Sequence, residues 1–446
     1  MSSDLPPPIL SDPNGGLKRS ALHAFYGAVW WVAIVLGSVW WVTRSLYDRE
    51  FRAMVRGRLG FDLPKPPGPG ERDRILIHGV SVGEVKAAQA LVTRLEAELP
   101  ELEVVISTVT GTGQKVAREL YAGRRVVRFP VEPGLIVDRF LRRIRPVAVV
   151  LVELEIWPNF LRGANRRGIP IAVVNGRITE RSFASYSRFR NLLPQFNRIS
   201  LFCVQAEEYG DRFAGLGCDR ERILLTGNVK ADSLGDGPVD AGEELRRLLG
   251  GAPGQLVLTA GSTHDDEELQ LLRVWLDGLR ELRLILVPRH PQRAAEVVTA
   301  ARELGVAVQR LSELRAGQAP DPSAPVIVDT IGELERVYGL SDLVFIGGSL
   351  VPHGGQNMLE PASQGLPVLY GPHVGNFPIE ARLLEDAGAA LRLGGTAELG
   401  PRLRELMDAP ERRAAMARAG LEVVRAQKGA TARTLEALRE RCLQRG

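Results

Sequence analysis

The sequence Val147-Ala-Val-Val-Leu-Val-Glu153 is an unbroken apolar run that ends on a carboxylate. A continuous apolar run of this length is typical of a strand that is buried on both faces of a parallel sheet. The charge comes only where such a strand would leave the core. This stretch therefore predicts an α/β fold built on a parallel sheet.

Similar runs recur along the chain and are separated by stretches with helical periodicity. In the first half they are Ile75–Val80, Val104–Thr108, Val126–Val131, Ile171–Asn175, Leu201–Gln205 and Ile223–Thr226. In the second half they are Leu256–Ala260, Leu282–Val287, Val306–Arg310, Val326–Asp329, Leu343–Ile346 and Pro367–Tyr370. We therefore predict two doubly wound, Rossmann-type domains over 70–230 and 256–446, joined by a linker over 231–255 and facing each other across a cleft. The residues from Pro401 onward are expected to be helical and to belong to the second domain.

The composition supports a large folded core. Of 446 residues, 45% are hydrophobic and 25% are charged, which excludes a disordered chain. The 57 Lys and Arg residues exceed the 53 Asp and Glu residues by only four, so no nucleic-acid partner is expected. Three cysteines without a Cys-x-x-Cys pair exclude a disulfide framework and a cysteine-built zinc site.

The N-terminal region differs from the rest. From Ser20 to Thr43 there is no Asp, Glu, Lys or Arg. As a helix this stretch is about 36 Å long, enough to cross a hydrocarbon core of about 30 Å. Arginines are frequent from Arg44 to Arg58, which predicts that the following domains lie on the cytoplasmic side of the membrane. An interfacial helix and a cleaved signal peptide are the alternatives to this membrane anchor over 20–43.

The first candidate site is His78-Gly-Val-Ser-Val-Gly-Glu84, which follows a predicted strand and leads into a helix predicted over 85–99. Glycines such as Gly83 permit a tight turn and the approach of a substrate. Glu84 then lies in the first helical turn, where it can act as a general base and where the helix dipole favours its ionised form. Ser81-x-x-Glu84 is also a capping box, so a purely structural role explains the same pattern.

The second candidate site is Glu153-Leu-Glu-Ile-Trp-Pro-Asn159, directly after the strand quoted above. Glu153, Glu155 and Trp157 at a strand end are typical of a polar, aromatic-edged sugar site. The alternative is a strand end that Pro158 simply terminates.

The second half contains a glycine-rich loop, Gly347-Gly-Ser-Leu-Val-Pro-His-Gly-Gly-Gln-Asn-Met-Leu-Glu-Pro361. Its pattern predicts a strand, a loop and a helix that begins at Asn357 with Glu360 in its first turn. Such a loop can present backbone N–H groups to a phosphate, although a structural loop is the alternative. The sequence has neither a Walker motif nor a G-x-G-x-x-G fingerprint, so ATPase and dinucleotide-binding functions are excluded here.

Two further stretches in this half carry polar groups after predicted strands. In Gly261-Ser-Thr-His-Asp-Asp-Glu-Glu268, Ser262 or Thr263 can cap a helix whose dipole the acidic run complements. A metal site at Asp265 and Asp266 is the alternative. Arg289 follows the strand Leu282–Val287 and can pair with a phosphate or carboxylate.

An ordered set of motifs now becomes recognisable. They are Ser81-Val-Gly-Glu84, Glu153-x-Glu-x-Trp-Pro-Asn159, Gly227-Asn-Val-Lys230, Gly261-Ser-Thr-His264, Val287-Pro-Arg-His290, Gly347-Gly-Ser349, Gly354-Gly-x-Asn-x-Leu-Glu360 and Gly371-Pro-His373. Together they resemble the 3-deoxy-D-manno-octulosonic acid (Kdo) transferases of lipopolysaccharide synthesis. The likeness runs from about residue 20 to about residue 430, with one departure at Leu154, where the family has a small polar residue.

The resemblance implies a GT-B-like, inverting glycosyltransferase that moves Kdo from CMP-Kdo to the lipid A precursor, lipid IVA, at the inner membrane and without a metal or other cofactor. It leaves open how many Kdo units are added. The alternatives are another membrane-bound GT-B glycosyltransferase, a sugar-nucleotide epimerase, and a non-catalytic, membrane-tethered nucleotide-binding protein.

The resemblance also implies roles for individual residues. Glu84 corresponds to the proton acceptor of the family. The implied donor site consists of Pro288, Arg289, Ile331, Gly332, Glu333, Asn357, Met358, Leu359 and Glu360. The candidate acceptor and cleft residues are Ser81, Gly83, Glu153, Glu155, Trp157, Lys230, Ser262, His264, Gly348 and Ser349.

Overall fold

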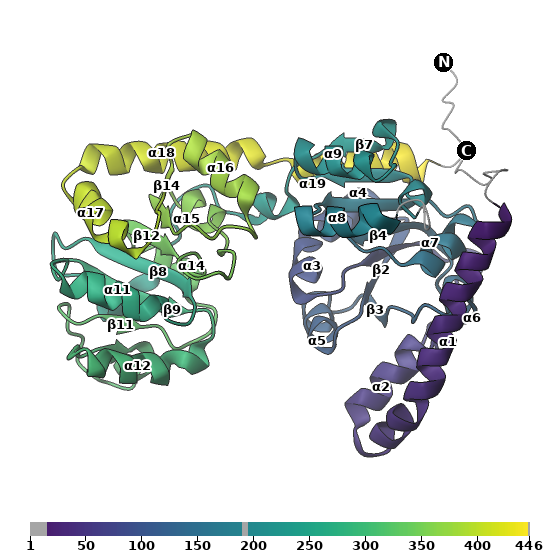
Figure 1. Ribbon diagram of the computed structural model, residues 1–446, viewed down its shortest axis with the longest axis horizontal. Helices are drawn as coiled ribbons and strands as arrows, with labels where there is room; N and C mark the ends of the chain where they lie inside the picture. Colours follow the sequence, from purple (N-terminus) through teal and green to yellow (C-terminus); the bar gives the residue numbers. More distant parts are fainter. Residues whose placement is uncertain (1–15, 190–194, 445–446) are drawn as a thin grey trace. The chain divides into compact units, whose positions relative to one another are not determined.

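The structure, a computed structural model, describes residues 16–189 and 195–444 and divides into two compact units. Unit 1 comprises the chain up to Ser233 together with the residues from Lys428 onward, and unit 2 comprises Leu234–Gln427. Each unit is an α/β sandwich with a parallel sheet between layers of helices (Figure 1).

The sheet of unit 1 has seven parallel strands in the order β3-β2-β1-β4-β5-β6-β7. The strands are β1 Asp73–His78, β2 Leu102–Thr108, β3 Arg125–Arg128, β4 Pro146–Val152, β5 Ile171–Gly176, β6 Leu201–Val204 and β7 Ile223–Leu225. The stretch that begins at Val147 forms β4, and its side chains from Ala148 to Val152 are buried. The strand order reverses between β1 and β4, which makes their carboxyl ends the expected ligand site of this unit.

The helices of unit 1 follow its strands in the alternation that the sequence predicts. They are α1 Gly16–Tyr47, α2 Arg49–Arg58, α3 Val82–Ala87, α4 Gln89–Glu98, α5 Gly111–Leu120, α6 Gly134–Ile144, α7 Pro158–Asn165, α8 Glu180–Phe189, α9 Glu207–Gly215 and α19 Ala430–Leu438. The single helix predicted over 85–99 is two helices, because the chain turns at Ala88 between α3 and α4.

The sheet of unit 2 also has seven parallel strands, in the order β10-β11-β9-β8-β12-β13-β14. The strands are β8 Val257–Thr263, β9 Arg283–Pro288, β10 Gln309–Arg310, β11 Val326–Ile327, β12 Leu343–Ile346, β13 Val368–Tyr370 and β14 Ala390–Arg392. Its strand order reverses between β8 and β12. The short strand β14 has no counterpart in the sequence prediction, because its three residues, Ala390–Arg392, do not form a continuous apolar run.

Both faces of this second sheet are covered. Along β9, Leu284 and Leu286 belong to one apolar core, and Ile285 and Val287 belong to another. The helices of unit 2 are α10 Gly242–Leu249, α11 Glu267–Leu276, α12 Ala294–Glu303, α13 Leu311–Arg315, α14 Leu334–Tyr338, α15 Leu359–Ser363, α16 Pro378–Asp386, α17 Thr396–Met407 and α18 Pro410–Gln427. Helices α11, α12 and α17 cover the first core, and α10 and α13–α16 cover the opposite face.

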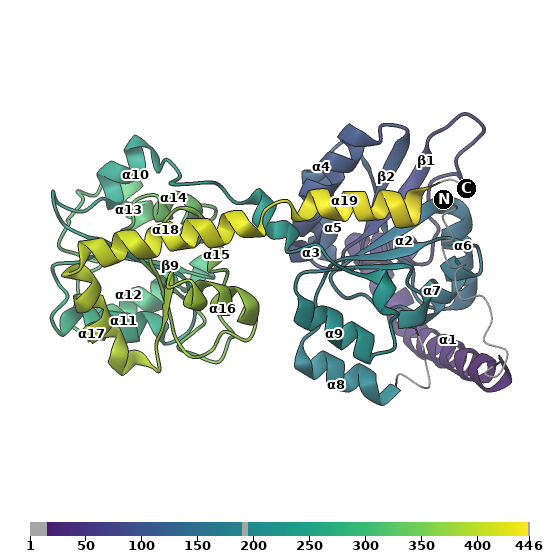
Figure 2. The ribbon, with the colours of Figure 1, turned by 90° about the horizontal axis from the view of Figure 1, so that it is seen from above.

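The predicted domain boundaries need two corrections. Helix α10, in the region predicted as a linker over 231–255, is part of unit 2, because Leu245, Leu248 and Leu249 are buried in its core. At the other end, residues 428–446 belong to unit 1 and not to a second domain over 256–446. Figure 2 shows α19, in yellow, lying along unit 1, where Leu435 and Leu438 enter the same core as Leu91 of α4.

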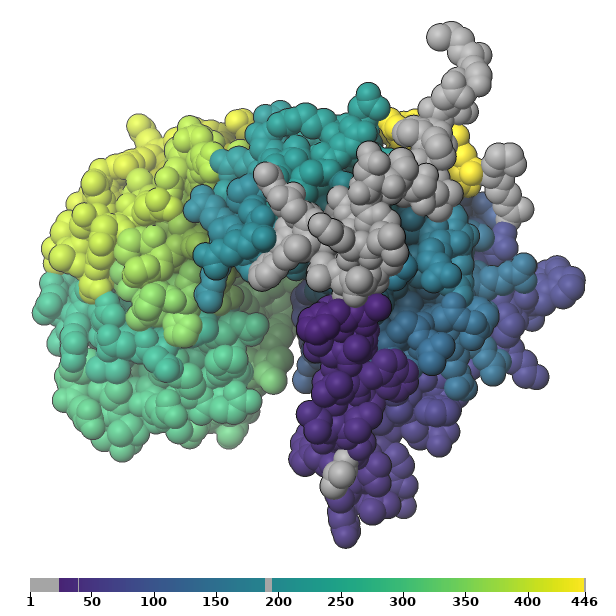
Figure 3. Space-filling model, turned by 45° about the vertical axis from the view of Figure 1, so that its right-hand side comes forward, coloured from purple at the N-terminus to yellow at the C-terminus, as the bar shows by residue number. Residues whose placement is uncertain are grey.

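Helix α1 contains the predicted anchor over 20–43 and presents large apolar side chains to solvent. The exposed ones include Phe25, Val29, Trp31, Val32, Val35, Leu36, Val42 and Leu46. Figure 3 shows the purple side chains of α1 and α2 as a projecting ridge on unit 1. None of the described helices alone meets the length and hydropathy needed for a membrane span, but Ala24–Ser38 and Trp40–Tyr47, bent by 50° from each other, meet them together. The spanning anchor stays a prediction.

The place of α19 in the core of unit 1 predicts a local stability effect. We expect Leu435→Ala to lower the free energy of unfolding of unit 1 by about 2–5 kcal/mol, because it leaves a cavity beside α4. Hydrogen exchange measured by mass spectrometry should show faster exchange in β1 and β2, while β8 and β9 keep their protection. Glu436→Ala, on the exposed face of the same helix, is the matched control. Loss of protection confined to unit 2 would contradict the assignment of α19.

Candidate active site

The candidate site of unit 1 lies at the carboxyl ends of β1 and β4, where the strand order reverses. The loop after β1 carries Ser81 and leads to Glu84 in the first turn of α3. The loop after β4 carries Glu153, Glu155 and Trp157. The two loops predicted separately from the sequence are therefore neighbours in the fold, because β1 and β4 pair side by side.

Glu84 forms the capping box that the sequence predicts. Ser81 Oγ accepts a hydrogen bond from Glu84 N at 3.4 Å and donates one to Glu84 Oε1 at 2.8 Å. Glu84 Oε2 accepts a hydrogen bond from Val80 N at 2.5 Å. The carboxylate is nevertheless half-buried, and burial raises the pKa of Glu84 above its ordinary value despite these hydrogen bonds. The helix terminus therefore does not hold Glu84 ionised as strongly as the sequence predicted.

Glu153 has the opposite electrostatic environment. Its Oε1 lies 2.8 Å from Lys230 Nζ and its Oε2 lies 2.9 Å from Arg177 Nε. Burial alone would raise the pKa of Glu153, but the charges of Lys230 and Arg177 outweigh it and place the pKa below its ordinary value. Asn175 Oδ1 accepts a hydrogen bond from Val229 N at 3.1 Å, which fixes the segment that carries Lys230.

Glu155 is the third carboxylate of this site. Burial, followed by the nearby charge of Glu84, raises the pKa of Glu155 to about 8. Trp157 Nε1 donates a hydrogen bond to Glu155 Oε2 at 3.0 Å. Carboxyl groups whose pKa values are pushed apart are able to take different roles, one as an ionised acceptor and another as a neutral donor. Glu84, Glu153 and Glu155 have this property.

The wall beside these carboxylates is aromatic and contains two further polar groups, His78 from the first candidate stretch and Glu132, which the sequence did not single out. The buried ring of His78 stacks on Phe129 with centroids 3.8 Å apart, and burial lowers the pKa of His78 to about 3, so it is neutral. Glu132 accepts hydrogen bonds from Asn159 N and Phe160 N at the start of α7. The only local signal for Glu132 is an acidic residue directly after the apolar run that contains β3.

In unit 2 the structure corrects the prediction for the glycine-rich loop. The N–H groups of Gly348, Ser349 and Leu350 do not face outward, because all three donate to the carboxylate of Glu267 at 2.6, 2.9 and 2.9 Å. Glu267 also accepts a hydrogen bond from His264 N at 2.9 Å and is completely buried. These three N–H groups of the loop are therefore already satisfied by a side chain of the protein.

The start of α11 differs from the prediction as well. Neither Ser262 nor Thr263 caps the helix, which begins at Glu267 after Asp266 in a left-handed conformation. Thr263 Oγ1 donates to Glu268 Oε1 at 2.8 Å instead. Glu267 and Glu268, at the end of the acidic run, therefore accept hydrogen bonds from other parts of the protein at this edge of the sheet.

Two of the three implied donor segments are exposed at the carboxyl edge of the second sheet. Pro288 ends β9 and is buried, whereas Arg289 beside it is exposed. Ile331 is 84% exposed, and Gly332 has a φ of +88°. Glu333 Oε1 lies 2.8 Å from Arg315 Nη1 and so is held by an ion pair.

The third donor segment is the beginning of α15. This helix starts at Leu359 and not at Asn357, and it has five residues. Asn357 Oδ1 accepts a hydrogen bond from Leu359 N at 3.2 Å, and Asn357 Nδ2 donates to Glu360 Oε1 at 3.0 Å. Met358 and Leu359 are buried beneath them. A helix this short contributes little dipole, so any anion here depends on side chains.

His264 lies near two other histidines that also follow strands. Its ring stacks on His353 with centroids 4.3 Å apart, and the ring of His290 is 6.2 Å away. In the described parts of the chain, no three His, Cys, Asp or Glu side chains are placed to hold a metal ion. Transfer without a metal or other cofactor stays a prediction.

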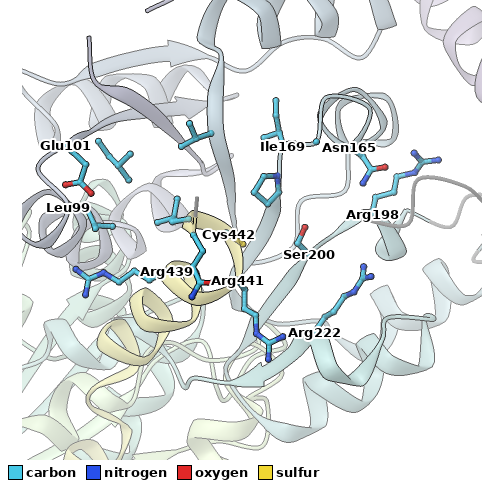
Figure 4. A pocket seen from close by; sticks show the side chains of 16 residues that line it. Leu99, Glu101, Asn165, Ile169, Arg198, Ser200, Arg222, Arg439, Arg441 and Cys442 are labelled. Atoms are coloured by element: carbon cyan, nitrogen blue, oxygen red, sulfur yellow. The ribbon is translucent and has the colours of Figure 1, made fainter. Parts of the chain in front are cut away.

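A cavity of about 870 Å³ lies at the opposite, amino edge of the unit 1 sheet (Figure 4). Ser200 and Arg222 line it just before β6 and β7, together with Arg441 and Cys442 from the end of the chain. None of the predicted site residues lines this cavity. Although it is large, this cavity is therefore not the candidate active site.

The pKa values of this site predict how the stability of unit 1 depends on pH. The folded chain holds a proton on Glu155 up to about pH 8, whereas the unfolded chain releases it near 4.5. The stabilising effect of that proton is complete below the unfolded value and is lost as the pH rises toward 8. We expect Glu155→Gln to flatten the fall in unfolding free energy between pH 5 and pH 8, measured by urea denaturation. Glu132, whose pKa burial raises to about 7, and Glu84, whose pKa burial also raises, contribute to the remaining slope. Parallel pH curves for the variant and the wild type would contradict this.

Comparison with known proteins agrees with this arrangement. Residues 53–233 match the family model described as 3-deoxy-D-manno-octulosonic-acid transferase (kdotransferase). Over 406 residues the chain is 34% identical to the 3-deoxy-D-manno-octulosonic acid transferase of Haemophilus influenzae, covering 89% of this chain and 93% of that protein. Over 434 residues it is 31% identical to the enzyme of the same name from Chlamydophila psittaci, covering 95% and 97%.

Solved structures share the fold. A glycosyltransferase from Rickettsia africae superposes with a TM-score of 0.58 at 11% identity, covering 84% of this chain and 100% of that one. The UDP-GlcNAc 2-epimerase from Neisseria meningitidis gives a TM-score of 0.57 at 14% identity, covering 82% and 100%. The fold of two Rossmann-type units is thus GT-B-like. With more than 30% identity along nearly its whole length, the chain belongs to the family of 3-deoxy-D-manno-octulosonic acid transferases.

Proposed function

We propose that this protein is an inverting glycosyltransferase that transfers Kdo from CMP-Kdo to the lipid A precursor, lipid IVA. Family membership supports the Kdo transfer. The observation that carries the mechanism is Glu84, a carboxylate at the point of strand reversal whose hydrogen bonds fix its orientation and whose pKa burial raises.

Glu84 is the proposed general base. A base works best when its pKa approaches the working pH, and partial burial shifts Glu84 in that direction. The N–H of Val80 and the hydroxyl of Ser81 hold the two carboxylate oxygens in place, and each oxygen has a further lone pair. The acceptor hydroxyl gives its proton to Glu84 as its oxygen bonds to the anomeric carbon of Kdo. The bond from that carbon to the phosphate oxygen of CMP breaks, and its electron pair leaves with CMP.

The other polar groups of unit 1 are suited to position a sugar. Glu153, Arg177 and Lys230 form one ion-paired group, so each is oriented before a substrate arrives. Glu155 with its raised pKa is protonated at neutral pH and can donate a hydrogen bond to a sugar oxygen. We propose that these groups, with Ser81, Gly83 and Trp157, contact the acceptor.

The donor contacts are proposed for unit 2. The guanidinium of Arg289 is exposed at the carboxyl end of β9 and is able to pair with the phosphate of CMP. Ile331 offers an exposed apolar side chain for the cytosine ring of CMP. Asn357 and Glu360 offer polar atoms for its ribose. Because Glu267 already accepts from the N–H groups of Gly348, Ser349 and Leu350, we propose that the arginine side chain supplies the charge that stabilises the leaving group.

We also propose that α1 holds the protein at the inner membrane, with both units on the cytoplasmic side. Support comes from the apolar side chains that α1 exposes and from the arginines that follow it. This placement suits a lipid acceptor, because the enzyme and its substrate are then confined to the same membrane surface.

Mass spectrometry of the lipid product tests the function. The full-length protein is incubated in detergent with the lipid A precursor and CMP-Kdo, and a product heavier by one or more Kdo residues is expected. Parallel reactions with UDP-sugars separate this activity from that of another glycosyltransferase or an epimerase. Modification of the lipid by a UDP-sugar, or no modified lipid with any donor, would overturn the proposal.

Glu84→Gln should reduce turnover by at least about 100-fold, because the amide cannot accept the proton. CMP binding, measured by calorimetry, should be unchanged. Ser81→Ala is the comparison variant: it removes the hydroxyl of the cap and its proposed acceptor contact, costing about 1 kcal/mol of stability, but leaves the carboxylate in place, so a smaller loss of turnover is expected. An equal loss of turnover in both variants would mean that the cap, and not the base, is essential.

Arg289→Ala should weaken CMP binding about 10- to 100-fold, because it removes a charge-assisted hydrogen bond to the phosphate. Calorimetry with CMP and with cytidine measures this directly, since cytidine lacks the phosphate and its affinity should not change. Arg302→Ala, on the exposed surface of α12, is the control. Unchanged CMP affinity would remove Arg289 from the donor site.

A further inference from the structure

A second cavity in unit 1, of about 780 Å³, is lined by both basic and acidic side chains, and several of the basic ones form no ion pair in the described structure. It is lined by α2, by the first turns of α5 and by the end of β3. Lys115, Arg118 and Arg128 line it, and Arg58, at the end of α2 beside the cavity, is close enough for the charge of Arg128 to lower its pKa. Within residues 16–189 and 195–444, none of these four side chains forms a hydrogen bond or an ion pair.

Two of these guanidinium groups are partly withdrawn from water. Arg58 Nε and Arg128 Nη1 are buried and have no partner within the described chain. The stem of Arg128 lies directly over Gly57, where an added Cβ would come within 2.9 Å of Arg128 Cδ. Burial and the neighbouring positive charges lower the pKa values of Arg58 and Arg128. Unpaired, desolvated charges are costly, so a fold that places them together is suited to an anion from outside the chain.

The acidic residues at this cavity do not supply that anion. Asp48 accepts a hydrogen bond from Phe51 N at the start of α2 and pairs with Arg44, and Asp62 pairs with Arg56. Glu50 attracts Arg128, and Glu119 also lines the cavity, but neither forms an ion pair with these cations in the described structure.

The cavity is joined to the Glu84 loop through one carbonyl. The oxygen of Val80 accepts hydrogen bonds from Thr108 Oγ1 at 3.0 Å and from Thr110 Oγ1 at 3.1 Å. Thr110 in turn caps α5 by accepting from Gly113 N at 3.0 Å. A side chain at residue 113 would collide with both threonine hydroxyls at 2.7 Å, so only glycine fits there. The first turn of α5 is therefore fixed relative to the proposed base.

One more group narrows the chemistry of the ligand. Gln114 is 3% exposed, lines the same cavity, and has an Oε1 atom without a hydrogen-bond partner in the described chain. An unpaired acceptor beside a cluster of cations calls for a ligand that carries a hydroxyl donor next to a phosphate. A phosphorylated sugar has both groups.

We infer that Arg58, Lys115, Arg118 and Arg128 form a binding site for a sugar phosphate monoester of the acceptor glycolipid, separate from the carboxylates that surround its reacting hydroxyl. This inference rests on the proposed function, since it assigns a second contact of the same substrate. The site selects acceptors by their phosphate and holds the sugar at the edge of the sheet on which Glu84 lies.

The test is direct binding of the phosphorylated lipid A precursor, and of the same glycolipid after enzymatic dephosphorylation, to the full-length protein in detergent micelles. The wild type should bind the phosphorylated form at least about tenfold more tightly, as expected for hydrogen bonds to charged groups. The double variant R58Q/R128Q should lose this preference. R125Q, on the same strand β3 but paired with Glu103, should keep it. A preference that survives in R58Q/R128Q overturns the site.

Stability separates binding from a structural role. Because Arg128 has no partner in the fold, the melting temperature of R128Q without ligand should equal or exceed that of the wild type. A marked decrease would show that Arg128 is structural and would overturn the proposal. If R58Q/R128Q does not fold, R118Q on the exposed face of α5 replaces it, with a smaller loss of preference expected and an unchanged preference counting against the site.

Two further measurements are needed. One distinguishes the phosphate of the acceptor from that of membrane lipids, and the other tests the proposed function separately from the site. Binding to phosphatidylglycerol vesicles should change equally little in R58Q/R128Q and R125Q. A loss confined to R58Q/R128Q would identify a bulk-membrane contact instead and overturn the proposal. Turnover with CMP-Kdo is measured separately. If there is no turnover but the phosphate preference is present and depends on the arginines, the proposed function is rejected and the phosphate site is not. Normal turnover with an unchanged preference in R58Q/R128Q rejects the site alone.

Discussion

Burial of a parallel sheet on both faces restricts polar chemistry to the ends of its strands. In β1 and β4 the side chains from Ile75 to Ile77 and from Val149 to Val152 are buried, and a charge among them would have neither water nor a partner. The first positions where a carboxylate is tolerated follow the last strand residue. Glu84 and Glu153 occupy such positions, and the reversal of strand order between β1 and β4 leaves the space that a substrate needs.

The two units use this edge differently. In unit 1 the carboxylates have different neighbours. Cations lower the pKa of Glu153, whereas burial raises the pKa values of Glu84 and Glu155, so the values diverge. In unit 2 Glu267 accepts hydrogen bonds from three main-chain N–H groups at the start of the glycine-rich loop. That arrangement keeps the loop rigid without a ligand. It also means that an anion at this edge must be recognised by side chains such as Arg289.

Local patterns predicted local structure well. The apolar runs located most strands, and Ser81-x-x-Glu84 predicted both the cap and the place of Glu84, because both depend on neighbours within four residues. The ion pair between Lys230 and Glu153 joins residues 77 positions apart, so only the folded sheet brings them together. Glu267 was missed because an acidic residue in the first turn of a helix is already explained by the dipole. The helix α19 was assigned to the wrong unit because an amphipathic pattern predicts a buried face but not which core buries it.

The return of the chain to unit 1 has a consequence for biosynthesis. The core of unit 1 is made mostly from the first half of the chain, yet Leu435 and Leu438 complete it from the far end. Unit 2 lies wholly between these two parts of the sequence. A ribosome therefore releases every residue of unit 2 before it releases the last helix of unit 1. The part of the protein that is synthesised first is the part that finishes folding last, and until α19 has been synthesised its surface beside α4 stays uncovered.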